Sequence, residues 1–462
     1  MASLNMRKPQ LPPQGGVPSQ RFEPSNTLRT HEGAPAARIS VEQQLRRSVC
    51  SCLLWESEFY EGGQEIAGRI QALAAQVPPK VLADLAVDAR SHFHLRHAPL
   101  LLCAVLARTG SGSRLVGDTL AETLQRADEL TEFLAIYAKV NGVPPSQLKK
   151  KVSAQVKKGL AQAFTKFDRY QLAKYFSPSA EAGQPVKGRD AMFLAHPKPR
   201  DAEQAALWKE FIAGEVKAAD TWEVSLSGGG DKRETFERLL REQNLGYLAL
   251  LRNLRNMAAA GVDEALMRGA IRARRGARRV LPFRYVAAAR AAPQFTGALD
   301  QSLSEAIAEL PLLPGRTLVL VDVSGSMDAQ LSARSDLTRV DAAAALAALI
   351  HGDVAAYSFS NRVVPVPERV GLAGVDNILR SQPHQGTELG GAVAWANAQP
   401  HDRLIVITDE QSHTYVPEPA APRAYMINVA SSNNGVGYGE RWTHLDGFSE
   451  HVIRFIHEFE QL

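Results

Sequence analysis

A carboxylate and two hydroxyls follow an apolar run in the pattern Asp322-Val-Ser324-Gly-Ser326. The preceding run, Thr317–Val321, is typical of a buried strand, so these side chains would lie where a strand ends and a helix begins. Carboxylate and hydroxyl oxygens suit hard divalent cations, and Gly325 permits a tight turn between the serines. The pattern predicts a site for Mg²⁺ or Mn²⁺.

Two later residues can complete this set of oxygen ligands. Thr387 precedes a helical pattern, and Asp409 ends the apolar run Leu404–Thr408. In an open α/β sheet, ligands bind at the carboxyl ends of the strands, so all five side chains could converge there. The alternative is that Asp322 and Asp409 only cap the following helices. A cap accounts for one Asp, but not for five oxygen donors in three loops.

The elements that would position this site begin after Pro311. Apolar runs predict buried strands, and helical patterns lie between them. Strands that alternate with helices favour a parallel, doubly wound sheet, so residues 311–462 are predicted to form an α/β domain. The expected strands are Thr317–Val321, Val354–Phe359, Arg403–Thr408 and Ala424–Val429, and the expected helices are Arg339–His351 and Leu389–Asn397.

The chain before this domain has a different pattern. Residues 1–36 are rich in Pro, Gly, Ser and Asn, which predicts a flexible arm. Residues 37–310 carry apolar positions at three- and four-residue spacing, which favours stacked helical pairs, although no clean repeat period is present. The predicted helices are Val41–Trp55, Gly63–Ala75, Pro79–Ala89, Pro99–Ala107, Gly117–Tyr137, Pro145–Lys166, Glu203–Ala213, Lys232–Glu242, Leu245–Ala259 and Val262–Ala273.

Charge separates the two parts of the chain. Residues 311–462 hold 10 Arg, no Lys and 17 Asp or Glu, a net charge of −7. Residues 1–310 hold the other 43 basic residues against 32 acidic ones, a net charge of +11. A basic N-terminal part favours a polyanionic partner there, although a solvated surface would have the same composition.

Composition also indicates the cellular compartment in which the protein would be found. Cys50, Cys52 and Cys103 are too few for a disulfide framework in a chain of 462 residues, and buried free thiols are expected. No apolar run approaches the roughly 20 residues of a membrane span, and no N-terminal apolar segment resembles a signal peptide. The composition is typical of a cytoplasmic protein that does not interact with membranes.

The metal pattern resembles the metal-ion-dependent adhesion site (MIDAS) of von Willebrand factor A domains. That family has Asp-x-Ser-x-Ser, then a Thr and then an Asp, which correspond here to Asp322, Ser324, Ser326, Thr387 and Asp409. The resemblance spans roughly residues 315–462. It implies a metal-mediated binding module and not a catalyst, in which the bound cation can accept one more carboxylate from a partner.

The helical part resembles the TROVE module of Ro ribonucleoproteins. Four segments carry this resemblance: an aromatic pair before a Gly-containing turn, a helix that ends in Thr-Lys-aromatic, a Leu-x-His-x-Lys-Pro segment and a later helix. They are Leu54–Gly63, Ala163–Phe167, Phe193–Pro199 and Leu250–Met257. Together with the adhesion-type domain, the resemblance covers about residues 40–462 and implies a bacterial Ro-like protein.

The resemblance implies a HEAT-like α-helical solenoid that closes into a ring. In that family, the ring holds single-stranded 3′ ends of defective noncoding RNA, and its outer surface binds Y RNA. The motif match places Lys166 and His196 at the cavity wall. The family has an Arg four residues beyond that Lys, whereas Arg169 here lies three beyond. Lys187 and Arg189 are further candidate phosphate contacts.

An arginine cluster near the junction of the two parts is a further RNA-binding candidate. It could grip RNA on the outer surface or only solvate a helix face, and its members are Arg272, Arg274, Arg275, Arg278 and Arg279. Two other patterns are weaker. His92, His94 and His97 lack an adjoining acid or Cys for zinc, and Ser227–Lys232 lacks the spacing of a phosphate loop.

The resulting hypothesis is a noncatalytic RNA-binding protein of RNA quality control, decay or repair. Its partners would be Y-like RNA and single-stranded 3′ ends, together with an exoribonuclease or an RNA ligase, and no DNA is expected. One alternative is a metal-dependent protein-interaction scaffold that does not bind RNA. Another is a metal-dependent nuclease that uses Asp322 and Asp409.

Overall fold

The structure is a computed structural model of the chain. It describes residues 29–30, 40–50, 63–177, 180–217, 219, 222–227, 230–331, 337–430, 436, 441–449 and 451–461. The chain divides into two compact units, one from residues 3–69 and 246–462 and the other from residues 70–245. The predicted arm, residues 1–36, lies outside the described residues except for Arg29 and Thr30.

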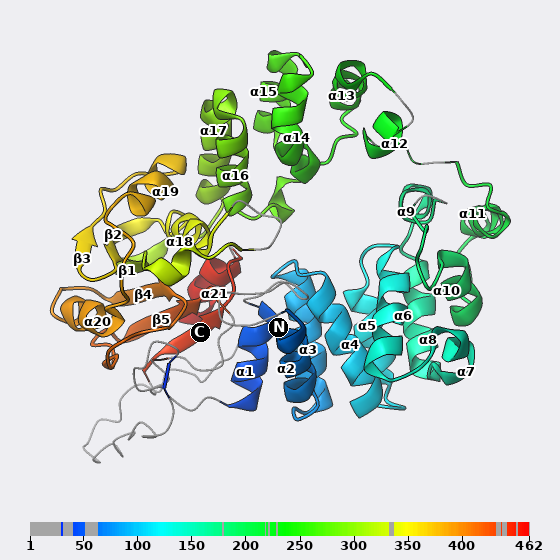
Figure 1. The fold of residues 1–462 in the computed structure, drawn as a ribbon, viewed down its shortest axis with the longest axis horizontal. Helices are drawn as coiled ribbons and strands as arrows, with labels where there is room; N and C mark the ends of the chain where they lie inside the picture. Colours follow the sequence, from blue (N-terminus) through cyan, green and yellow to red (C-terminus); the bar gives the residue numbers. More distant parts are fainter. Residues whose placement is uncertain are drawn as a thin grey trace. The chain divides into compact units, whose positions relative to one another are not determined.

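A six-stranded sheet forms the core of the C-terminal region (Figure 1). Its order is β3-β2-β1-β4-β5-β6, and every neighbouring pair is parallel except β2 and β3. The predicted parallel sheet is therefore confirmed, with an added antiparallel edge strand. The strands are β1 (Leu313–Asp322), β2 (Gly352–Phe359), β3 (Val363–Pro365), β4 (Arg403–Thr408), β5 (Arg423–Asn428) and β6 (Thr443–Asp446).

The order of the strands reverses direction beside β1. The chain runs outward from β1 to β2 and β3, and then crosses back to β4 on the other side of β1. Val321 of β1 pairs with Ile407 of β4, so the two strands end nearly level. Loops diverge at such a switch point, and this leaves room for a ligand at the carboxyl edge.

The helices of this region pack their apolar side chains against the sheet. Every residue of β4 is buried, as expected for a central strand that is covered on both faces. Leu389 and Val393 of α20 pack on Leu320 and Val406 in one cluster. The predicted bounds of α20 are confirmed, whereas the helix predicted to end at His351 ends at Ala347. The helices are α18 (Arg339–Ala347), α19 (Leu372–Leu379), α20 (Leu389–Asn397) and α21 (His451–Glu460).

Four further helices of the same unit form two stacked pairs. Helix α14 packs against α16, and α15 packs against α17. This arrangement agrees with the predicted stacking of helical pairs, whereas a HEAT-like repeat and closure into a ring stay predictions. The helices are α14 (Tyr247–Ala259), α15 (Glu264–Ala273), α16 (Phe283–Ala291) and α17 (Thr296–Ala308).

Helix α1 (Val41–Cys50) belongs to the unit that contains the sheet, although it lies far away in the sequence. The Arg47 guanidinium donates a hydrogen bond of 2.6 Å to the Glu410 carboxylate, just beyond β4. Both side chains are buried. The chain continues into α2 (Gly63–Ala74) after residues 51–62, which lie outside the described part.

All elements among the described residues of the second unit are helices (Figure 1). Its longer helices agree with most of the predicted segments. Short helices in the loops between them were not predicted. The elements are α3 (Pro79–Ser91), α4 (His97–Thr109), α5 (Arg114–Thr123), α6 (Glu129–Val140), η1 (Pro145–Gln147), α7 (Leu148–Lys151), α8 (Ala154–Phe164), α9 (Arg169–Tyr175), α10 (Gly188–Ala195), α11 (Ala202–Ala213), α12 (Trp222–Ser227) and α13 (Lys232–Arg241).

Two predicted helices of this unit are interrupted. The segment 117–137 splits into α5 and α6 because the Glu129 carboxylate accepts hydrogen bonds of 2.8 and 3.0 Å from the amides of Gln125 and Arg126. The segment 145–166 breaks before α8, where the Ser153 hydroxyl accepts a hydrogen bond from the Val156 amide. The helical spacing of apolar residues continues through both breaks, so this spacing alone does not predict the polar caps that interrupt the helices.

Glycines bring α5 and α8 into close contact. A Cβ added at Gly159 would lie 2.6 Å from the Gly117 carbonyl oxygen, and one at Gly117 would lie 2.9 Å from the Gln155 carbonyl oxygen. Both positions therefore need glycine for the helices to pack this closely. Their contact places the carboxyl end of α5 beside the segment that follows α8.

Burial agrees with one expectation from composition. Cys50 and Cys103 are buried, as predicted, whereas Cys52 lies outside the described residues. Among the helices that the structure describes, none combines the length and apolar character needed to cross a bilayer.

Replacing Glu460 with alanine should destabilise the sheet region by about 3–5 kcal/mol. Glu460 pairs with the fully buried Arg403 guanidinium, and its Oε1 also accepts a hydrogen bond of 2.9 Å from the Tyr425 hydroxyl. Its removal leaves a buried cation without its carboxylate. Urea denaturation measures the effect, with the exposed Glu458→Ala as the matched control. Equal midpoints for the two variants would contradict this account.

Candidate metal centre and basic residues

Asp322 lies fully buried at the end of β1. Its Oδ1 accepts a hydrogen bond of 2.8 Å from the Ser324 amide, and its Oδ2 accepts one of 2.6 Å from the Thr408 hydroxyl. Thr408 is the last residue of β4, so the bond joins the ends of the two central strands. The carboxylate is thus held at the predicted edge of the sheet.

The predicted serine and threonine donors lie in two adjoining loops. The Ser324 and Ser326 hydroxyl oxygens are 3.2 Å apart. The Gly325 amide donates a hydrogen bond of 2.7 Å to the Gln385 carbonyl, and this bond joins the serine loop to the loop that carries Thr387. Thr387 is only 3 % exposed. The structure therefore brings the loops of four predicted ligands to one edge.

Asp409 follows β4 beside Thr408 and is also fully buried. Burial, and after it the neighbouring Asp409 carboxylate, raise the pKa of Asp322 to about 7. Two buried carboxylates that repel each other fit the chemistry of a cation site, because a bound cation would offset both desolvation and repulsion.

Arg339, which the sequence analysis did not single out, lies beside Asp409. Its Nη1 is 3.8 Å from Asp409 Oδ2, and its side chain is 1 % exposed. It is the first residue of α18, whose start is fixed by a hydrogen bond from the Asp341 amide to the Thr338 hydroxyl. The sequence Thr-Arg-Val-Asp resembles a capping box and could have revealed this helix start.

The donor set fits a hard divalent cation. Asp322 and Asp409 would supply charge, and Ser324, Ser326 and Thr387 would supply neutral hydroxyl oxygens. The described residues hold no group of three or more His, Cys, Asp or Glu side chains suited to a metal ion. A site of two carboxylates and three hydroxyls does not require such a group.

A buried ionic cluster adjoins this edge. Glu410 accepts a hydrogen bond from Arg47 and lies 3.1 Å from His444 Nδ1, while Arg47 Nε is 3.5 Å from Asp446 Oδ1. Burial would raise the pKa of Glu410, but Arg47 and His444 outweigh burial and lower it. Glu410 has φ +60°, so its backbone is in the left-handed region. Charge and spacing in the sequence could not reveal this contact, because Arg47 and Glu410 are 363 positions apart.

Lys166, the first predicted RNA contact, caps a helix. Its ammonium donates hydrogen bonds to the Ala121 carbonyl and, at 3.1 Å, to the Leu124 carbonyl at the end of α5. Burial lowers its pKa, and Glu122 acts in the opposite direction. The residue as a whole is exposed. Its role at a cavity wall stays a prediction, and capping is a second role for the same cation.

Three other candidates of this unit are exposed, and two have partners within the chain. Arg169 forms two hydrogen bonds, of 2.5 and 2.9 Å, with the Glu210 carboxylate. Arg189 donates a hydrogen bond of 3.2 Å to the Ile212 carbonyl. Lys187 precedes α10 and donates its amide to Asp190. For Arg169 the alternative to an RNA contact is a surface ion pair, and its pairing with Glu210 matches that alternative, although exposed ion pairs are weak and exchange readily.

His196 ends α10 in an unusual conformation. It is exposed, has φ +47° and ψ +55°, and precedes Pro197. A non-glycine residue in this left-handed region carries a backbone cost, and such residues cluster at functional sites. The predicted role at a cavity wall agrees with this exposure but is not tested by it.

The arginine cluster divides into different environments. Arg274 has φ +49°, and its guanidinium is 2.8 Å from Glu309 and 3.6 Å from Glu305. Its side chain is 13 % exposed, so it stabilises the end of α15 against α17. Arg272, Arg275 and Arg278 are exposed, and among the described residues none of them has an acidic partner. The side chain of Arg279 lies outside the described part.

The fold defines a class: a helical protein with a C-terminal, mainly parallel sheet. Residues 196–274 match the model of the TROVE domain family. The fold is similar to the crystal structure of the Ro (RSR) protein of Deinococcus radiodurans, with a TM-score of 0.58 and 19 % identity over 91 % of this chain and 99 % of that chain. Among curated protein sequences, none matches. The predicted resemblance to a bacterial Ro-like protein is confirmed by the TROVE match and the fold.

The four segments that suggested this resemblance differ in whether they lie within the TROVE match and within the described residues. The TROVE match contains His196 and the segment Leu250–Met257, which lies in α14. The segment Ala163–Phe167 lies before the match but is described, at the end of α8. The segment Leu54–Gly63 lies outside the described residues except for its last position.

Mg²⁺ should raise the thermal stability of the protein through the site at Asp322. A ligand that binds only the folded state adds stability by mass action. Asp322→Asn should abolish this increase, and in EDTA it should be at least as stable as the wild type because one buried repulsion is removed. Differential scanning fluorimetry measures both effects, with Asp328→Asn, an exposed change in the same loop, as the control. An equal Mg²⁺ response in wild type and Asp322→Asn would rule out the site.

His196→Gly separates a structural role from an RNA-binding role. Glycine adopts φ +47° at no steric cost, so the variant should be stabilised, by up to roughly 1–2 kcal/mol. Loss of the imidazole should weaken RNA binding if His196 contacts RNA. Thermal melts and RNA titrations on the same preparation measure both quantities. Greater stability with unchanged RNA affinity would refute the RNA contact.

Proposed function

We propose that the protein is a noncatalytic RNA-binding component of a Ro-type ribonucleoprotein. It binds single-stranded ends of misfolded or damaged RNA and small, Y-like noncoding RNA. The observation that carries this proposal is the match of residues 196–274 to the TROVE domain within a fold similar to a bacterial Ro protein over 91 % of the chain. RNA quality control, decay or repair is the corresponding process.

The charge distribution supports a polyanionic ligand. Residues 1–310 carry a net charge of +11, whereas residues 311–462 carry −7. Exposed Arg272, Arg275 and Arg278 lie near the carboxyl end of α15 and in the turn that follows it. Most of the RNA affinity would then be electrostatic. A helical ring would admit an unpaired strand and exclude a folded duplex, and this selectivity belongs to the proposal.

The sheet region serves a different purpose in this proposal. We assign it to the von Willebrand factor A type, with Mg²⁺ or Mn²⁺ at Asp322, Ser324, Ser326, Thr387 and Asp409. The strand order and the converging loops support this assignment. When bound, the cation would accept a carboxylate from a protein partner. An exoribonuclease or an RNA ligase is the partner class that suits RNA-end recognition, in the cytoplasm.

The proposal predicts that an RNA hairpin with a single-stranded 3′ tail binds tightly at low ionic strength. Affinity should fall with salt on a log–log slope of about −0.7 for each single-strand phosphate contact. A blunt hairpin of the same sequence should bind more weakly. Filter-binding titrations over several salt concentrations measure both.

The same titrations discriminate the alternatives. A protein-interaction scaffold predicts no salt-sensitive RNA binding at any ionic strength, and that result would refute the proposed function. A nuclease predicts Mg²⁺-dependent RNA cleavage that disappears in Asp409→Ala. The proposal requires intact RNA after prolonged incubation with Mg²⁺.

A further inference from the structure

Two arginines share the exposed face of α14. Arg252 and Arg255 are both exposed and lie three residues apart, so their side chains project from neighbouring turns. The opposite face is buried through Leu250, Leu251 and Leu254. The helix is thus fixed by its apolar side and presents two cations on the other.

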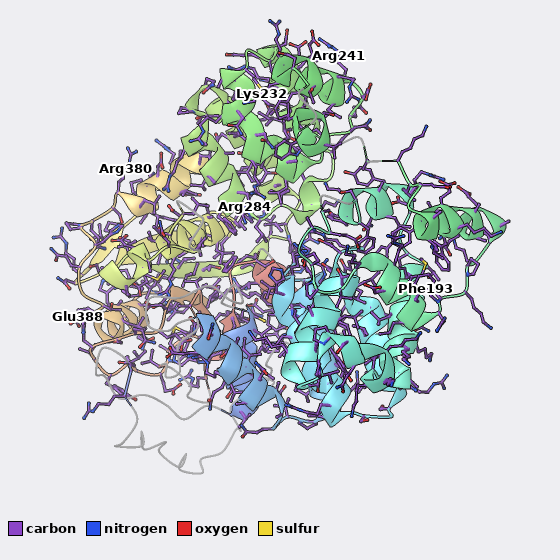
Figure 2. All side chains as sticks on the ribbon, turned by 45° about the vertical axis from the view of Figure 1, so that its right-hand side comes forward. Phe193, Lys232, Arg241, Arg284, Arg380 and Glu388 are labelled. Atoms are coloured by element: carbon purple, nitrogen blue, oxygen red, sulfur yellow. The ribbon has the colours of Figure 1, made fainter. Side chains whose placement is uncertain are left out.

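A third arginine lies on the neighbouring helix. Arg284, which is labelled in Figure 2, is in the first turn of α16. This helix packs against α14. It is half-buried, and its Cζ lies 4.8 Å from the centroid of the Phe283 ring. Phe283 packs edge-on against Phe448 at 5.4 Å between ring centroids, which anchors this turn.

These three arginines form no salt bridge among the described residues. By contrast, other arginines on α16 and on the neighbouring α15 pair with carboxylates: Arg268 with Glu264, Arg274 with Glu309 and Arg290 with Asp341. Burial lowers the pKa of Arg284, and the positive charge of Arg252 lowers it further. A guanidinium stays charged at any physiological pH, so like charges lie close together in a partly desolvated place.

Repulsion between these cations destabilises the protein when no ligand is bound, and the same cations would attract an anion. Each guanidinium presents several N–H donors in a plane that matches the oxygens of a phosphate. Arginines spaced by one helical turn can contact successive phosphates of a strand. The stretch lies within the residues that match the TROVE domain, apart from Arg284.

We propose that Arg252, Arg255 and Arg284 form an anion site that takes backbone phosphates of bound RNA. This assignment rests on the proposed RNA-binding function and extends it to three arginines that the sequence motifs do not mark as RNA contacts. Contacts to phosphates carry no sequence preference, so the site would serve RNA of any sequence.

The first test compares RNA titrations of the wild type and of R252Q/R255Q. Both changes lie on an exposed face, so the variant should fold normally. The variant should lose affinity equally for different tail sequences, and its log–log salt slope should become shallower by about 1.4 for two phosphate contacts. The control R369Q/R380Q removes the same charge from exposed positions of the sheet region and should retain the wild-type slope.

The second test uses inorganic phosphate alone. Phosphate at constant ionic strength, compared with chloride, should raise the melting temperature of the wild type more than that of R252Q/R255Q or Arg284→Gln. Without phosphate, R252Q/R255Q should melt at the same temperature as the wild type or higher, because it removes like-charge repulsion. An arginine that serves only structure would produce the opposite change.

Distinct results would overturn the two proposals. If the wild type binds RNA but R252Q/R255Q retains its salt slope, the anion site is not an RNA contact, although RNA binding stands. If the phosphate response is equal in wild type and variant, no anion site exists there. If the wild type shows no salt-sensitive RNA binding, the proposed function and the RNA assignment both fail, and a phosphate response would then indicate a free anion.

Discussion

The central constraint in the sheet region is the burial of two carboxylates at neighbouring strand ends. Asp322 and Asp409 are fully buried because β1 and β4 end nearly level and the loops beyond them fold over the edge. Buried charges of one sign need compensation from hydrogen bonds, cations or protons. Thr408, the Ser324 amide and Arg339 supply part of it. The geometry of the surrounding loops follows from this requirement.

The position of these side chains at the carboxyl edge of the sheet could be predicted because the sequence patterns that indicate it are local. A carboxylate after an apolar strand and a threonine before a helix are short patterns, and parallel topology brings such patterns together. The short β3 and β6 were missed, since β3 has three residues and β6 has four, of which three are polar. Arg339 was missed because its role depends on a contact with Asp409 across 70 residues of chain, which no local pattern encodes.

The basic residues were predicted less completely, for a physical reason. The sequence shows that a residue is positively charged, but it does not show which groups of the fold that charge contacts. Lys166 caps α5, Arg169 pairs with Glu210 and Arg274 pairs with Glu309. The structure was needed to identify Arg252, Arg255 and Arg284 as a candidate anion site. Their helices α14 and α16 pack together, and among the described residues these arginines have no such ion pairs. Three-dimensional neighbours, more than clustering along the chain, decide which cations are available to a ligand.

The salt bridge between Arg47 and Glu410 determines whether the sheet region could fold as a separate fragment. Glu410 directly follows Asp409, yet its counter-charge comes from a helix near the other end of the sequence. A chain that began at Pro311 would contain every predicted cation ligand but would bury Glu410 without its arginine. The sheet region is therefore not self-sufficient, although its strands and helices are contiguous. Its integrity depends on a short helix that precedes residues 196–274, the part that matches the TROVE domain, so the first and last parts of the chain must come together for this region to fold.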